Sequence, residues 1–220
     1  METRNLSELT QTNDRTTAPS AAAPKTRVKD AEIQAFRWYI PMPLALARED
    51  CRQSGDDLNQ LLADVITLRD LYKKHHWQAS GPTFYPLHLL FDRHAGQIDE
   101  MIDQIAERIM TLGGVAIAMG ADVAEATLIP RPPKGREDTA TQLSRLLHAH
   151  EVILEEARAM ARLAAERGDD GTNDLIVSSV IRLNETQVWF LAEHLVDSRA
   201  AGAGKPHADD RNGQTSGRSI

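Results

Sequence analysis

Apolar side chains recur at intervals of three and four residues between Leu58 and Tyr72, and the repeat ends near Ser80-Gly81-Pro82. This spacing places the apolar residues on one face of a helix, and the glycine and proline that follow are typical of its end. The pattern therefore predicts a first long amphipathic helix. Its repeating positions are Leu58, Leu61, Leu62, Val65, Leu68, Leu71 and Tyr72.

Three further stretches have the same helical period. Thr83 can cap a second helix, with Pro86 in its first turn, that runs to Gly113-Gly114. A third helix is expected over about 138–167 and a fourth over about 172–197, separated by a Gly-Asp-Asp-Gly sequence. The apolar positions of the second helix include Leu90, Ile98, Ile102, Ile105 and Ile109.

The segment that joins the second and third helices is long and broken. Residues 115–136 contain two glycines and three prolines, which prevent a long helix, although residues 121–126 can form a short one. A long connection here and short ones elsewhere are what a ferritin-like bundle requires for its two helix pairs to lie alongside each other. The sequence therefore predicts an all-α, ferritin-like four-helix bundle with a short helix in the connection, while periodicity alone also allows other bundles.

The two ends of the chain lack this pattern. Residues 1–30 are rich in Thr, Ala, Asn, Ser and Pro, and residues 199–220 are polar with several glycines, so neither segment can offset the entropy of ordering. We expect a disordered N-terminal tail over 1–30, the bundle over 31–198 and a disordered C-terminal tail over 199–220.

Composition narrows the class of protein further. Aromatic residues are only 5% of the chain, so the core must be aliphatic, and the net charge of -7 argues against a body coated in basic residues for binding phosphates. A single cysteine, Cys51, cannot form an internal disulfide. The N-terminus lacks the apolar run of a signal peptide, and no stretch approaches the length required to cross a bilayer. A cytoplasmic protein with no membrane contact is the expectation.

Two pairs of candidate metal ligands lie on the second predicted helix. His88 and Asp92 are four residues apart, as are Asp103 and Glu107, so each pair projects from one helix face. Asp92 and Asp103 are eleven residues apart, which gives nearly the same direction around the helix but about 16 Å along its axis. One ion cannot touch both pairs. His76, near the end of the first helix, can join His88 and Asp92 in an antiparallel hairpin.

A two-fold dimer with antiparallel second helices would place the second pair of one subunit against the first pair of the other and create two equivalent sites. Imidazole and carboxylate ligands without thiolate suit Fe(II) and fit structural zinc poorly. Taken singly, however, either pair is more often part of a solvated helix face.

The spacing of these residues resembles the core of the Dps family of mini-ferritins. The resemblance rests on His76-Trp77 with Gly81, on His88 with Asp92, and on Asp103 with Glu107-Arg108 followed by Leu112-Gly113-Gly114. It extends through the Trp189-Phe190-Leu191 run of the last helix. It implies a hollow homododecamer whose dimer interfaces contain ferroxidase centres formed by His76, His88, Asp92, Asp103 and Glu107. Such centres oxidise Fe(II), preferably with hydrogen peroxide, and the product is a ferric mineral in the cavity.

Several other histidines and aspartates allow two interpretations of their role. His150 on the third helix is a possible extra ligand, although an exposed charged face is the simpler interpretation. His75 should point away from His76 and lie at the surface or behind the site. Asp169, Asp170 and Asp174 are expected to cap the last helix. The resemblance implies in addition that they line three-fold pores through which iron enters.

A different class of function is a nucleoid-coating shell that binds DNA with little ferroxidase activity. Residues 1–30 contain five basic and four acidic side chains, and residues 199–220 contain four basic and two acidic ones. Some relatives in the Dps family bind DNA through lysine-rich tails, and this chain lacks a dense lysine cluster. The weak attractions of twelve basic tails for DNA could still add together, although the acidic shell would repel the DNA.

Overall fold

The computed structural model describes residues 32–196 and contains four long helices. The expected disordered tails at 1–30 and 199–220 lie outside the described residues. The first three long helices are α1 (Arg48–Gln78), α2 (Phe84–Thr111) and α4 (Thr139–Glu166). The fourth is continuous through α5 (Asp170–Leu175), the π-helix η1 (Ile176–Ile181) and α6 (Arg182–Glu193). Residues 32–196 contain no strand, which confirms the predicted all-α fold.

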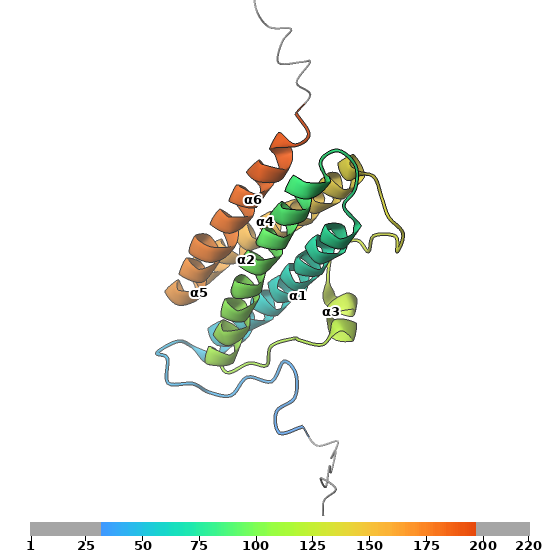
Figure 1. Ribbon diagram of the computed structural model, residues 1–220. Helices are drawn as coiled ribbons and strands as arrows, with labels where there is room; N and C mark the ends of the chain where they lie inside the picture. The colour runs from blue at the N-terminus through green and yellow to red at the C-terminus, as the bar shows by residue number, and fades with distance from the viewer. Residues whose placement is uncertain (1–31, 197–220) are drawn as a thin grey trace, which may run out of the picture. The chain divides into compact units, whose positions relative to one another are not determined.

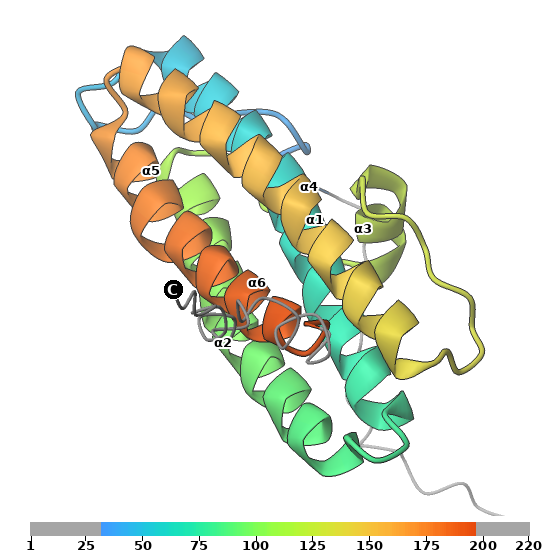
Figure 2. The ribbon, with the colours of Figure 1, turned by 90° about the horizontal axis from the view of Figure 1, so that it is seen from above.

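The helices form a bundle with one long crossover (Figures 1 and 2). A short turn at residues 79–83 makes α1 and α2 an antiparallel hairpin. Helix α4 begins beside the end of α1, where the Thr139 hydroxyl donates to Ser80 O at 3.4 Å, and it ends beside the start of α1, where Arg167 pairs with Asp57 at 2.7 Å. Helices α2 and α4 are therefore parallel. The connection between them runs the length of the bundle and contains α3 (Gly120–Ala126), which packs on α1.

The core is aliphatic, as the composition predicts. All seven repeating positions of the first predicted helix are buried, and Tyr72 and Phe91 are the largest fully buried side chains. The apolar face of α2 is also buried at Ile98, Ile105 and Ile109, while Leu90 and Ile102 are partly buried against the core. The helical period thus located the inward faces correctly.

The ends of the helices agree only in part with the sequence signals. Asp138 caps α4 by accepting a hydrogen bond from Thr141 N at 3.0 Å. The expected cap at Thr83 is wrong, because its side chain makes no capping hydrogen bond and Phe84 N donates to Gly81 O instead. The last helix contains the π-helical segment η1, an insertion that a regular apolar period does not reveal.

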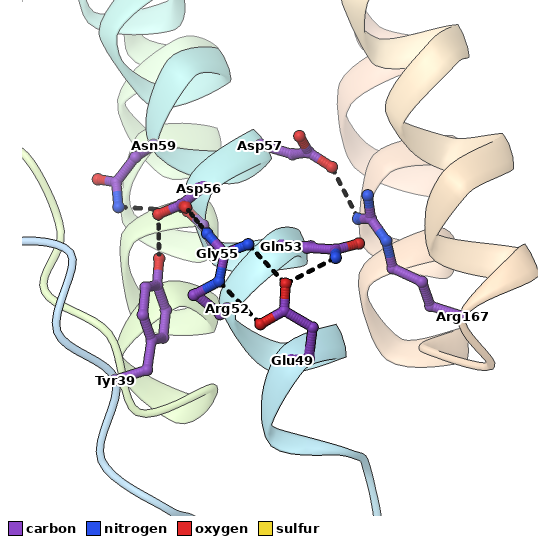
Figure 3. Close-up of polar contacts among 9 residues, drawn as sticks. All are labelled: Tyr39, Glu49, Arg52, Gln53, Gly55, Asp56, Asp57, Asn59 and Arg167. Atoms are coloured by element: carbon purple, nitrogen blue, oxygen red, sulfur yellow. Dashed lines mark hydrogen bonds and ion pairs between the residues drawn. The ribbon is translucent and has the colours of Figure 1, made fainter.

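Residues 34–47 form an irregular segment, the N-terminal strap, against the end of the bundle where α1 begins. Tyr39 anchors it: this side chain is buried, and its hydroxyl donates to Asp56 at 3.1 Å (Figure 3). Burial, together with the charge of Asp56, raises the pKa of Tyr39 well above its usual range. The Tyr39 ring lies against Gly55 and Gly114, where a methyl group would overlap it. The strap therefore depends on two glycines that carry no side chain.

We expect Gly55→Ala to displace Tyr39 and to lower the free energy of unfolding by about 1–3 kcal/mol, despite the higher helix propensity of alanine. Gly120→Ala is the control, because nothing lies within 4 Å of the added methyl. It should change stability by less than about 0.5 kcal/mol. Urea denaturation followed by circular dichroism measures both. Equal stability of the two variants would show that the Tyr39 contact does not hold the strap.

Candidate metal centre

The closed end of the α1–α2 hairpin brings His76 and His88 together. Their rings stack with centroids 3.8 Å apart and an angle of 18° between the planes. Nδ1 of His76 lies 2.8 Å from His88 O, and Nδ1 of His88 lies 2.9 Å from His76 O. Because a carbonyl oxygen only accepts, each Nδ1 carries a proton, and Nε2 is the nitrogen that remains to bind a metal. The reciprocal hydrogen bonds thus fix both rings in the tautomer that binds a metal through Nε2.

Asp92 completes this cluster on one chain. Its Oδ1 lies 3.9 Å from His76 Nε2 and accepts a hydrogen bond from Lys73 Nζ at 2.7 Å. The Lys73 ammonium is the main reason that the pKa of Asp92 is lowered, and the two histidines add to the effect. The carboxylate is therefore ionised and paired with a cation. We call His76, His88 and Asp92 the half-site.

Asp103 and Glu107 are exposed on the same helix and lie farther along it. The eleven residues from Asp92 to Asp103 place them about 16 Å away in α2. Within residues 32–196 of a single chain, no three His, Cys, Asp or Glu side chains converge closely enough to hold a metal ion. The single chain therefore places His76 beside His88, with Asp92 Oδ1 3.9 Å from His76 Nε2, but forms no complete metal site, and it leaves Asp103 and Glu107 apart.

The structure does not support His150 as an extra ligand, nor the alternative of an exposed charged face, because His150 is fully buried. Asn184 Nδ2 donates to Val180 O, so Asn184 Oδ1 is free to accept from His150 Nδ1, at 2.7 Å. His150 Nε2 then accepts from the Tyr72 hydroxyl at 2.7 Å. The hydroxyl oxygen in turn lies 3.0 Å from His94 Nδ1 and accepts from it. Both ring nitrogens of His150 are occupied within the bundle.

His75 does not lie at the surface, which was one of its two expected positions. It is fully buried, packs near Phe91 with ring centroids 6.4 Å apart, and neither ring nitrogen has a hydrogen-bond partner. Burial lowers its pKa to about 4, so the ring is neutral. His75 is a core residue rather than a surface one.

The three acidic residues at the start of the last helix separate into two kinds. Asp169 is buried, accepts from Thr172 N at 3.1 Å and pairs with Arg108 at 2.5 Å, so it caps α5 and is removed from the surface. Asp170 and Asp174 are exposed. Only these two have carboxylates available to line a pore, and that role stays a prediction.

The sequence reasoning missed the partners of the site residues. Lys73 lies three residues before His76, and that helical spacing was a signal that both side chains share a face. Arg69 extends the same row and pairs with Asp99 at 2.7 Å. The pairing of Arg108 with Asp169 depends on tertiary packing, and no local spacing indicates it.

Chemically, the half-site offers two imidazole nitrogens and one carboxylate oxygen. This donor set fits a divalent ion of intermediate softness, such as Fe(II), with positions left open for further ligands. The residues present therefore fit the ion that their spacing predicts.

Comparison with known proteins finds a ferritin-like family model and similar proteins named for binding or protecting DNA. The model of the ferritin-like domain family matches residues 55–201. A nutrient stress-induced DNA-binding protein of Nostoc sp. is 30% identical over 175 residues, which cover 79% of this chain and 95% of that protein. A DNA protection during starvation protein of Agrobacterium fabrum is 31% identical over 63% of this chain and 85% of that protein.

Solved structures of Dps proteins are also similar to this chain. DpsC from Streptomyces coelicolor is 54% identical to this protein and superposes with a TM-score of 0.76. The match covers 76% of this chain and 98% of DpsC. Dps from Vibrio cholerae, described as a ferritin-like diiron-carboxylate protein, is 28% identical over 70% of this chain and 96% of that chain, with a TM-score of 0.67.

Among residues 32–196, no helix has the length and apolar character needed to cross a membrane.

Acid should destabilise the protein through the buried histidines. Burial lowers the pKa of His150 to about 4 and that of His94 to about 3, whereas in the unfolded chain both titrate near about 6.5. Between about pH 4 and about pH 6.5 the unfolded chain binds more protons than the folded protein. The free energy of unfolding therefore falls as the pH drops over this range. In His150→Gln this fall should be shallower by up to about 1.4 kcal/mol per pH unit.

His148→Gln is the matched control, because His148 is exposed on the same helix. Its pH profile, measured by urea denaturation at a series of pH values, should parallel that of the unmodified protein. If His150→Gln also gave a parallel profile, His150 would not be held neutral in the folded state.

Proposed function

Since this chain belongs to the Dps family of ferritin-like proteins, we propose that it oxidises Fe(II) with hydrogen peroxide at centres shared between two subunits. The Fe(III) product is stored as a mineral within a homododecameric shell. This reaction would protect the cell and its DNA from peroxide, and the protein would act in the bacterial cytoplasm.

The observation that supports the proposal best is the half-site itself. His76 and His88 are locked in the metal-binding tautomer and lie beside an ionised carboxylate, yet one chain supplies only three donors there. A site for two metal ions requires more oxygen ligands than this. Asp103 and Glu107, exposed and without another partner in the described part of the chain, are suited to supply them from a second copy.

The surroundings of the half-site also favour a subunit interface. Three large apolar side chains near it are exposed in the single chain: Trp77 at 71%, Tyr85 at 68% and Leu89 at 50%. Exposed apolar groups of this size typically mark a contact surface. A two-fold contact that covers them would bring each half-site toward the Asp103 and Glu107 of its mate.

In the proposed reaction two Fe(II) ions each lose one electron and one hydrogen peroxide takes up both, with two protons, to give two molecules of water. His76 and His88 hold the substrate ion through Nε2, and their backbone hydrogen bonds prevent the rings from turning. The carboxylates of Asp92, Asp103 and Glu107 favour the more highly charged product. Few protein donors leave room for peroxide to approach.

Lys73 occupies Asp92 before iron arrives. Its ammonium satisfies the carboxylate and keeps it ionised in the free protein. A cation that binds through Asp92 Oδ1 competes with Lys73 for that oxygen. Lys73 is therefore a positioning residue for the ligand, with no role in electron transfer.

We expect His76→Ala and Asp103→Ala each to lower the initial rate of Fe(II) oxidation by peroxide by more than about tenfold, because each removes a direct ligand. Stopped-flow absorbance measures the rate. Glu100→Ala is the control, an exposed acid on the same helix that the proposal leaves out. Rates in the two ligand variants equal to that of the control would exclude this site.

A nucleoid-coating function is the alternative, and the names of the Nostoc and Agrobacterium relatives favour it. Under this alternative the tails bind DNA, so a gel shift at low salt should show retardation that weakens when residues 1–30 are deleted. Binding through phosphate contacts would also weaken steeply with added salt. No retardation by the full chain at low salt would exclude the coating function and leave iron oxidation untouched.

A further inference from the structure

Helix α2 has a second regular stripe of residues, on the side opposite its buried face. It runs from Tyr85 to Met110, and its members follow one another at alternating intervals of four and three residues. All of them are exposed except Ala106, which is partly buried. An average interval of 3.5 residues is the repeat along which two helices pack against each other. We call this stripe the seam, and it consists of Tyr85, Leu89, Asp92, Gly96, Asp99, Asp103, Ala106 and Met110.

The two ends of the seam are apolar and its middle is polar. Tyr85 and Leu89 form one end and are 68% and 50% exposed, and Met110 at the other end is 52% exposed. Exposed apolar groups of this size favour a partner surface that covers them. A second copy of α2 offers such a surface, because it has apolar groups at the same distances from its middle. The apolar ends of the seam can therefore cover those of another copy.

The ligand positions select how the two copies align. The proposed centre brings Asp92 of one chain to the partner's Asp103, which places the two-fold axis between residues 97 and 98 of antiparallel helices. The same axis sets Tyr85 opposite the partner's Met110, so the apolar ends cover each other. A shift by one repeat of about seven residues would instead set Tyr85 against the partner's Asp103. One alignment thus satisfies both the iron ligands and the apolar ends.

The middle of the seam contains a hollow with positive charge beside it. At Gly96 nothing lies within 4 Å of where a Cβ would be, and the selected alignment sets this glycine opposite the partner's Asp99. Arg69 uses Nε for Asp70 and Nη1 for its own Asp99, and its Nη2 has no hydrogen-bond partner among residues 32–196. An incoming carboxylate would therefore meet an available guanidinium donor. The hollow, about 380 Å³ in volume, is lined by Arg69, Lys73, Asp92, Ala95, Gly96 and Asp99.

We propose that two copies of this chain pair through the seam, antiparallel, with Asp99 of each copy in the hollow over the partner's Gly96. Each Asp99 would then be shared between its own Arg69 and the partner's Arg69. The inference deepens the proposed function, because it names the surface by which the second subunit reaches the half-site, and it rests on that function for the alignment.

The apolar ends of the seam also have a place in the proposed iron centres. Tyr85 precedes His88 by three residues, and Met110 follows Glu107 by three, so each apolar side chain is a neighbour of a ligand on the helix surface. Where the ends of two seams meet, Tyr85 and the partner's Met110 would lie just outside the ligand set. They would limit the access of water to the substrate ion from that side.

Engineered cysteine pairs test the alignment. With Tyr85→Cys and Met110→Cys in one chain, mild oxidation should join two chains, which a non-reducing gel detects. Tyr85→Cys alone should join at least about tenfold fewer chains, because its two copies lie about 37 Å apart along the antiparallel helices. Tyr85→Cys with Gln104→Cys is the matched control, since Gln104 is exposed outside the seam and the native Cys51 is buried. A double variant that joins no better than the single variant or the control would contradict the proposed alignment.

A side chain in the hollow tests the contact with Asp99. Gly96→Gln adds atoms where its own chain leaves open space, so helix content should be unchanged, but it occupies the position of the partner's Asp99. We expect the dissociation constant of the chain pair to rise at least about tenfold, measured by sedimentation velocity over a dilution series. Gly120→Gln is the control, because that position is also open. Unchanged association in Gly96→Gln, or an equal loss in Gly120→Gln, would overturn the proposal.

Both experiments use the protein without iron, so they separate the seam from the proposed function. Joined chains, together with an unmodified protein that fails to oxidise Fe(II) with peroxide, would keep the seam and exclude the function. Oxidation by the unmodified protein, with no joining of the double variant, would keep the function and exclude the seam.

Discussion

The rigidity of helix α2 keeps the two pairs of proposed iron ligands apart. Asp92 and Asp103 lie on nearly the same side of α2, but eleven residues of regular helix keep them about 16 Å apart. No change of rotamer can close that distance. The half-site is consequently fixed at one end of the α1–α2 hairpin and the two remaining acids beyond it. In the proposed centre a complete donor set therefore requires another subunit, so helix geometry would couple the proposed chemistry to assembly.

The hydrogen-bonded polar network inside the bundle is poorly suited to hold a cation. In the di-iron proteins of this fold, acidic side chains and Glu-x-x-His motifs point into the centre of one bundle. Here the largest network of polar groups at the centre of the bundle contains Tyr72, His94, His150 and Asn184, joined in one chain of hydrogen bonds. All four are neutral, and both histidines have depressed pKa values. A cation placed among them would lack compensating charge, whereas the half-site lies at the surface beside an ionised carboxylate.

The sequence predicted the elements that depend on local pattern. Helix positions, the inward faces and the pairing of His88 with Asp92 follow from intervals of three and four residues, and the turn between the first two helices adds His76 to that pair. Interactions between distant segments could not be predicted in this way. The burial of His75 and His150, the pairing of Arg108 with Asp169, and the Tyr39 contact with Gly55 each require the packed bundle. The contribution of Asp103 and Glu107 from a second subunit is still a prediction.

Mixing inactive variants tests the shared site most directly. His76→Ala and Asp103→Ala subunits, unfolded and reassembled together in equal amounts, should form mixed dimers in which one of the two sites has every ligand intact. Random pairing puts half of the dimers in this class, so about a quarter of the original Fe(II) oxidation rate should return. Each variant reassembled alone is the reference. A mixture no more active than its components would contradict a site built from two chains.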